Sequence, residues 1–60
     1  MFIRIVNEEI VDIQRYGVRL SEENLMLHND YITQFIYKYN NKEYLIIKMN
    51  GEVVTALQIK

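Results

Sequence analysis

The dipeptide Asn50-Gly51 constrains this chain more than any other feature of its sequence. It lies between two runs rich in β-branched and aliphatic residues, 43–49 and 52–59. A two-residue turn of type I′ needs a positive φ angle at both central residues, and Asn followed by Gly satisfies that need. The sequence therefore predicts a β-hairpin formed by these two runs.

A second hairpin is predicted immediately before the first. Asn40-Asn41 separates residues 32–39 from the strand that begins near residue 43, and asparagine tolerates the left-handed region of backbone conformation. We therefore expect the C-terminal half to be a three-stranded antiparallel meander, with strands near 31–39, 43–49 and 52–59.

Alternation along these strands sorts the side chains into two faces. With two-residue turns, Tyr37 faces Tyr44, Ile47 faces Val54 and Leu45 faces Ala56. One face is then aliphatic, and the other is aromatic and weakly basic. The aliphatic face carries Ile32, Ile36, Leu45, Ile47, Met49, Val54 and Ala56. The aromatic face carries Phe35, Tyr37, Tyr39, Tyr44, Ile46, Val53, Leu57 and Ile59, with Lys42 and Lys48 among them.

The N-terminal half is expected to supply a short strand and one helix. Phe2 to Val6 is rich in β-branched residues and predicts the strand. Asn7 resembles a helix N-cap before two glutamates, and Gly17 fits the left-handed position just past a helix end. These signals favour a helix over 8–16, which would cover the aliphatic face through Ile10 and Ile13. The rival interpretation is a second strand, because Val11 and Ile13 also alternate along the chain.

The segment between the helix and the meander gives weaker signals. Val18 to Leu20 predicts a short extended piece. Ser21 to Asp30 is polar at both ends and apolar in the middle, and it is expected to be a loop with one helical turn capped by Ser21.

Composition predicts a small soluble domain spanning residues 1–60. Half of the 60 residues are apolar and the net charge is −1, which excludes a disordered tail and disfavours a DNA-binding module. There is no cysteine, so no disulfide can stabilise the chain and no thiolate can bind a metal. The longest apolar run, Tyr44 to Ile47, is four residues, too short to cross a membrane. We expect an intracellular, cytoplasmic protein.

Catalytic residues are scarce. The chain has one histidine, His28, and one serine, Ser21, whereas a hydrolytic triad or a metal site needs several convergent groups. The carboxylate pairs at 8–9 and 22–23 are adjacent in sequence, and adjacent residues of a helix diverge by about 100°. We therefore expect no enzymatic activity, no cofactor and no metal.

Four segments resemble a known family. They are Tyr16-Gly17-Val18-Arg19-Leu20-Ser21, Ile32-Thr33-Gln34-Phe35-Ile36, Asn40-Asn41 and Glu43-Tyr44-Leu45-Ile46. They lie within residues 16–46, about half of the chain, and resemble a small phage-encoded anti-CRISPR family that inhibits the RNA-guided nuclease of type II-A systems. The resemblance implies a helix followed by a three-stranded antiparallel sheet. It also implies that Asn40, Asn41 and Glu43 lie at a hairpin that helps to contact the nuclease.

The expected function is therefore that of a non-enzymatic, protein-binding inhibitor. Its partner would be a larger host protein or nucleoprotein complex, such as an RNA-guided CRISPR nuclease. Two alternatives remain open: a homo-oligomeric module that buries its second sheet face against its own copy, and a sheet that stacks single-stranded nucleic acid on its aromatic face. The predicted protein-binding residues are Tyr37, Tyr39, Asn40, Asn41, Lys42, Glu43 and Tyr44.

Overall fold

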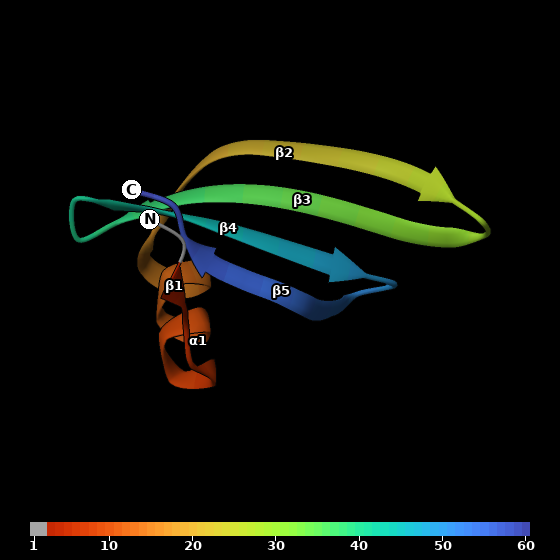
Figure 1. Ribbon diagram of the computed structural model, residues 1–60. Helices are drawn as coiled ribbons and strands as arrows, with labels where there is room; N and C mark the ends of the chain where they lie inside the picture. The colour runs from red at the N-terminus through yellow and green to blue at the C-terminus, as the bar shows by residue number, and fades with distance from the viewer. Residues whose placement is uncertain (1–2) are drawn as a thin grey trace.

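A computed structural model describes residues 3–60 and shows one helix against an antiparallel sheet (Figure 1). The elements in chain order are β1 (Ile3–Arg4), α1 (Asn7–Tyr16), β2 (Val18–Leu27), β3 (Asp30–Tyr39), β4 (Lys42–Met49) and β5 (Glu52–Gln58). The strand order across the sheet is β1-β5-β4-β3-β2. The predicted α+β class is confirmed. Phe2, where the predicted first strand begins, lies outside the described residues.

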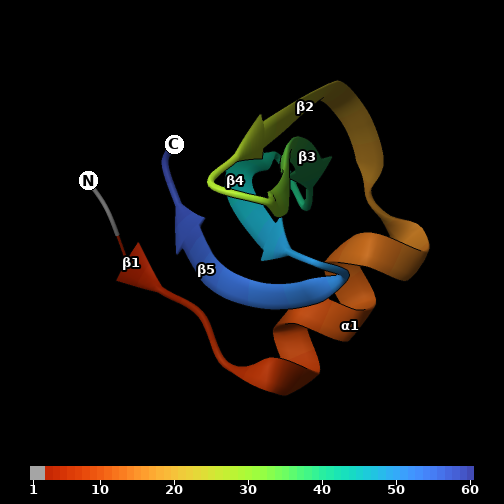
Figure 2. The same cartoon turned by 90° about the vertical axis from the view of Figure 1, so that its right-hand side faces the viewer.

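The helix covers only part of the sheet. It lies under the end near the β3–β4 turn, while the hairpin of β2 and β3 extends beyond it (Figure 1). Seen from the end of the strands, the sheet is strongly twisted and α1 lies on one side of it (Figure 2). Among the described residues, no helix or strand lies on the other side.

Three two-residue turns connect the four long strands. The turn residues are His28-Asn29, Asn40-Asn41 and Asn50-Gly51, and all six have a positive φ angle between 50° and 89°. Positive φ at both positions is the signature of the type I′ turn, whose twist matches that of the flanking strands. The turns predicted at Asn40-Asn41 and Asn50-Gly51 are confirmed.

Val18 to Leu20 are extended as predicted, but the prediction of a loop with a helical turn over residues 21–30 was wrong. Val18 to Leu27 form a single ten-residue strand, with no helical turn at Ser21, so the meander has four long strands rather than three. All ten residues of β2 are exposed, because this strand lies at the sheet edge and beyond the helix. Neither of its faces needed an apolar pattern, so the period-two signal that identifies a buried strand was missing.

The helix is confirmed and ends at Tyr16 as predicted, but neither of its two caps has the predicted form. The N-cap is Val6, and no side chain caps the helix by a hydrogen bond, so Asn7 does not act as predicted. Gly17 has φ −73° and ψ 162°, which is extended and not left-handed. Glycine is needed there because a Cβ atom would lie 2.5 Å from the backbone oxygen of Ile13 and 3.2 Å from that of Lys38.

The register between β3 and β4 is the predicted one throughout, including Tyr37 opposite Tyr44. The register between β4 and β5 is as predicted only beside the turn. Lys48 pairs with Val53, but Ile47 pairs with Thr55, so Val54 is the extra residue of a β-bulge. The bulge moves every later residue of β5 to the face opposite the predicted one, because side chains alternate with a period of two.

The core lies between α1 and the aromatic face of the sheet. Its buried residues are Ile13, Phe35, Tyr37, Tyr44, Ile46 and Ala56, with Ile5, Ile10 and Tyr39 packed against them. The prediction that α1 covers the aliphatic face was therefore wrong. Ile13 is the one helix residue that is fully buried, and a helix with so narrow an apolar stripe needs broad rings beneath it to fill the space above the sheet.

Candidate functional site: the open face of the sheet

The face of the sheet opposite α1 is aliphatic, and no described element covers it. We call this surface the open face. The pairing of the strands arranges its side chains in rows across the sheet, such as Ile36, Leu45 and Leu57 side by side on β3, β4 and β5. Its aliphatic members are Leu25, Leu27, Ile32, Ile36, Leu45, Ile47, Met49 and Leu57.

These side chains screen one another only in part. The members on the central strands are half-buried by their neighbours, whereas Leu25, Leu27 and Met49 are exposed. Polar residues interrupt the rows at Gln34 and Thr55 and border them at Lys38 and Glu43. An apolar centre with a charged rim is the usual composition of a protein interface.

Two of the predicted binding residues do not lie on any exposed surface. Tyr37 is 8% exposed and Tyr44 is 5% exposed, and both pack under α1. The assignment of these two tyrosines to a docking surface was wrong, because the helix covers the aromatic face. Tyr39 is half-buried at the margin of the same core.

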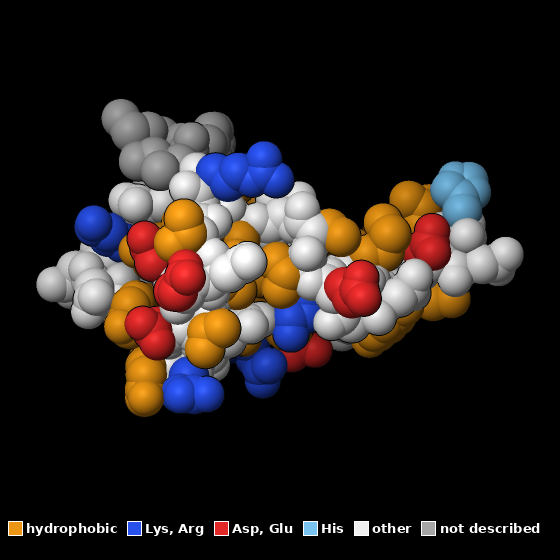
Figure 3. Space-filling view, turned by 90° about the horizontal axis from the view of Figure 1, so that it is seen from below, with side chains coloured by type: hydrophobic (Ala, Val, Ile, Leu, Met, Phe, Trp, Pro, Cys, Tyr) orange, Lys and Arg blue, Asp and Glu red, His pale blue; other side chains and the backbone are white. Residues whose placement is uncertain are grey.

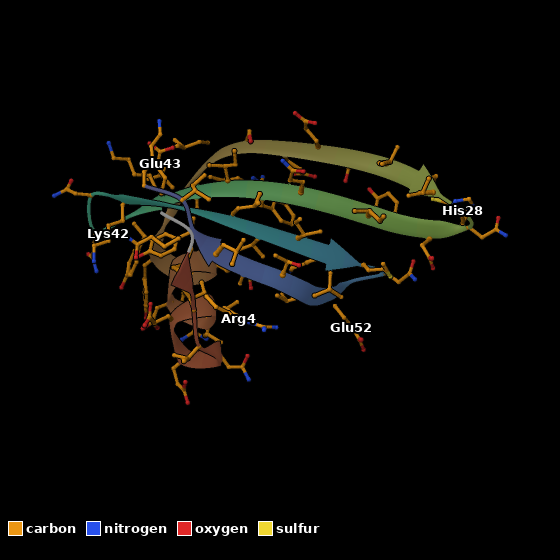
Figure 4. The ribbon with its side chains drawn as sticks, in the orientation of Figure 1. Arg4, His28, Lys42, Glu43 and Glu52 are labelled. Atoms are coloured by element: carbon orange, nitrogen blue, oxygen red, sulfur yellow. The ribbon has the colours of Figure 1, made fainter. Side chains whose placement is uncertain are left out.

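The remaining predicted residues are brought together at one end of the sheet. Asn40, Asn41 and Lys42 are exposed in the β3–β4 hairpin, and Glu43 is half-buried. Lys42 and Glu43 point to opposite sides of the sheet (Figure 4), as neighbours in a strand do. The Glu43 carboxylate lies 3.9 Å from the Lys60 ammonium group, so the charge at this corner of the open face is largely balanced.

Burial also changes the acidity of one predicted residue. Desolvation raises the pKa of the Tyr44 hydroxyl above its ordinary value near 10, and the nearby Glu9 carboxylate and Tyr39 raise it further. The Tyr44 hydroxyl therefore stays protonated and neutral at physiological pH. Its place beneath α1 is that of a structural residue.

The predicted stacking of single-stranded nucleic acid requires aromatic rings that are exposed to solvent. Phe35 is 9% exposed and lies beneath α1 with Tyr37 and Tyr44. The cationic groups of Arg19 and Lys48 lie 5.7 Å and 5.6 Å from the centre of its ring. The rings that would stack bases are thus occupied by the protein itself.

Polar groups on the helix side of the β2–β3 hairpin bond to one another. The Asn24 side-chain oxygen accepts hydrogen bonds from the Tyr31 hydroxyl at 2.8 Å and the Thr33 hydroxyl at 3.0 Å. Arg19 and Glu22 form an ion pair of 3.1 Å on β2. These contacts stiffen the part of the hairpin that extends past α1.

Concave and metal-binding features are limited in the part of the chain that the structure describes. A cavity of about 120 Å³ opens between the start of α1 and the bulge of β5, below the size of a typical ligand site. It is lined by Arg4, Ile5, Asn7, Ile10, Val53, Val54, Thr55 and Ala56. Over residues 3–60, no three histidine or acidic side chains are placed to hold a metal ion, and no helix is long and apolar enough to span a bilayer.

Comparison of the chain with protein-family models, with curated proteins and with solved structures finds no match. The candidate site therefore rests on geometry.

Sequence reasoning found five residues of the open face but expected the helix to cover them: Ile32, Ile36, Leu45, Ile47 and Met49. Leu57 was placed on the aromatic face because the bulge in β5 was not predicted. The apolar rows were visible in the sequence, whereas the choice of which face α1 covers depends on how the chain passes from β1 across the sheet to β2. Leu25 and Leu27 were missed as members, because the strand that carries them was not predicted.

Proposed function

We propose that this chain is a non-enzymatic inhibitor that docks by its open face on a larger protein. The observation that carries the proposal is the uncovered aliphatic surface on the side of the sheet opposite α1. Covering about 400 Å² of apolar surface is worth at most about 10 kcal/mol at roughly 25 cal/mol/Å². That upper bound approaches the whole folding stability of a small domain, so a partner has much to gain by covering this face.

The partner that we propose is the RNA-guided nuclease of a type II-A system, because of the family resemblance in the sequence. The resembling segments fall on the end of α1, on β2, β3 and β4 and on the turn between the last two strands. One helix followed by consecutive antiparallel strands is the order that the resemblance implies. The exposed turn at Asn40-Asn41 lies at the end of the open face. The turn and the open face are therefore placed to contact the same target surface.

A cleavage assay with a purified type II-A nuclease, its guide RNA and a matched DNA target tests this proposal. We expect the wild-type chain to inhibit cleavage. Met49→Lys places a charge on the open face at an exposed position and should abolish inhibition. Val11→Lys is the matched control, since Val11 is exposed on α1 away from the open face. Far-UV circular dichroism checks that both variants are folded.

Three results would count against the proposal. No inhibition at a large excess of wild-type chain would exclude this nuclease as the target. Equal inhibition by Met49→Lys and Val11→Lys would exclude the open face as the docking surface. A dimer that Met49→Lys dissociates would show that the open face is a contact between copies, which is the homo-oligomeric alternative.

A further inference from the structure

Among residues 3–60, no strand pairs with the outer edge of β2. β2 is the last strand of the sheet, and it bonds to β3 alone. Its ten residues rise by about 3.4 Å each, so the edge is about 30 Å long. A free edge presents backbone N–H and C=O groups that can pair with another strand.

Natural proteins usually protect such an edge with charged side chains, above all lysine, or with proline, a bulge or a covering segment. The opposite edge of this sheet is partly covered, because β1 pairs with β5 and the Ile5 N–H donates to the Ala56 oxygen. β2 has a bulge between Arg19 and Ser21 and two charged side chains at Glu22 and Glu23, but the stretch from Asn24 to Leu27 is regular and contains no charged residue and no proline.

The end of this stretch is also apolar on both faces. Leu25, Met26 and Leu27 are 56%, 63% and 47% exposed. In the space-filling view from the helix side, hydrophobic side chains gather beside His28 at the far tip of the molecule (Figure 3). An edge strand with exposed apolar side chains and no protecting residue is prone to pair with a strand of another molecule.

We propose that β2 pairs in antiparallel fashion with β2 of a second copy of this chain, about a two-fold axis at Leu25. Two five-stranded sheets would then become one continuous ten-stranded sheet. The pairing uses the backbone of the β2 edge and shares only Leu25 and Leu27 with the open face, and the inference does not depend on the proposed inhibitor function.

Charge selects this register over its neighbours. An axis at Glu22 or Glu23 would place that glutamate opposite its own copy, and like charges directly opposite are destabilising. An axis at Asn24 would set both glutamates opposite Met26 and Leu25 of the second copy. An axis at Met26 would leave only three residues of each strand paired.

The axis at Leu25 sets no glutamate opposite its own copy, and it sets only one glutamate, Glu23, opposite an apolar residue, Leu27 of the second copy. It places Leu25 opposite its own copy and Asn24 opposite Met26, and it brings Glu22 of one chain toward His28 of the other, where an acid meets an imidazole. On the open face, Leu25 and Leu27 of both copies then form one apolar cluster that continues into Ile32, the partner of Leu25 on β3. The two helices do not obstruct the contact, because this end of β2 extends beyond α1 (Figure 1).

The dimer should be weak and dependent on concentration. Two strands paired over five residues bury less than the roughly 1,200 Å² of a stable standard interface. Sedimentation velocity or light scattering from about 10 µM to about 1 mM should show a rise in mean mass toward that of two chains. A constant monomer mass over this range would overturn the proposal.

Cysteine cross-linking tests the register, because the wild-type chain has no cysteine. Directly opposed residues of an antiparallel pair have Cα atoms about 4.5–5.5 Å apart, within the range of a disulfide. Leu25→Cys should therefore form a symmetric disulfide under mild oxidation. Glu22→Cys is the matched control on the same strand, since its two copies would lie about 20 Å apart.

We expect Leu25→Cys to cross-link at least about tenfold faster than Glu22→Cys. Equal rates would overturn the proposed axis. Leu25→Lys, which adds a protective lysine to the edge, should raise the dissociation constant at least about tenfold while circular dichroism stays native. A dimer that survives Leu25→Lys but is lost in Met49→Lys would assign the contact to the open face and refute the edge pairing.

Discussion

Asn50 joins the two hairpins at the far end of the sheet, and replacing it by aspartate tests how much this junction contributes. Its side-chain oxygen accepts a hydrogen bond from the Tyr31 N–H at 2.8 Å, and its side-chain nitrogen donates to the Asp30 carboxylate at 3.0 Å. Asn50→Asp keeps the acceptor for Tyr31, and aspartate also tolerates the positive φ of the turn. The change therefore replaces one donor by a negative oxygen and leaves the backbone unchanged.

The cost follows from the geometry of the Asp30 contact. A hydrogen bond to a charged group contributes about 1.5–3 kcal/mol, and the lower end applies here because Asn50 is exposed. Two carboxylates about 3 Å apart repel by about 1.4 kcal/mol in water, a value that rotation of the side chains reduces. We expect Asn50→Asp to lower the free energy of unfolding by about 2 kcal/mol.

Urea denaturation followed by circular dichroism measures this loss, which should move the midpoint by about 1–2 M. The double variant Asp30→Asn with Asn50→Asp reverses the polarity of the bond, because the new amide at 30 donates to the new carboxylate at 50. It should recover most of the lost stability, giving a coupling energy of about 2 kcal/mol. An unchanged midpoint in Asn50→Asp, or a double variant less stable than the single one, would refute this reasoning.

Three further substitutions test the helix side of the sheet. Tyr44→Phe should leave neutral stability nearly unchanged. The pKa of Tyr44 is raised in the folded chain, so its contribution to stability is fully present below pH 10 and is lost as pH rises through the pKa of the folded state. Thermal melts from pH 8 to 12 should therefore show a smaller loss of stability at alkaline pH in the variant than in the wild type. Gly17→Ala should cost about 2–3 kcal/mol by urea denaturation, because its Cβ would lie 2.5 Å from the Ile13 oxygen; a stability equal to wild type would contradict the close approach. Ile13→Ala removes a fully buried side chain and should cost about 2–5 kcal/mol, seen as lost helical circular dichroism; a native spectrum and midpoint would show that α1 does not depend on it.

Sequence reasoning succeeded where a local rule determines the structure. The β3–β4 register follows from Asn40-Asn41, since two residues that tolerate positive φ fix a two-residue turn and the turn fixes every pair beyond it. The α+β class follows from the same turns and from the acidic start and basic end of α1.

It failed where the outcome depends on more distant parts of the chain. The bulge at Val54 has no residue that marks it, so the sequence placed Leu57 on the aromatic face and Ala56 on the aliphatic one. Tyr37 and Tyr44 were assigned to a binding surface because tyrosine suits interfaces as well as cores, and only the path of α1 decides between the two. The open face itself was predicted as apolar, but as the side that the helix buries.

The pairing pattern of the sheet also divides the molecule into two cooperative units. Residues 18–58 form a meander in which each strand pairs with the next along the chain, so its contacts close by short loops and need little search. Residues 3–16 are held by the two-residue strand β1, whose partner Gln58 is distant in sequence, and by one fully buried side chain, Ile13. This segment should dock last during folding and open first in the native state, so amide protons of α1 should exchange with solvent before those of β3 and β4. Each such opening would expose the rings of Tyr37 and Tyr44 to solvent. The helix α1 therefore shields an aromatic surface that would otherwise favour aggregation.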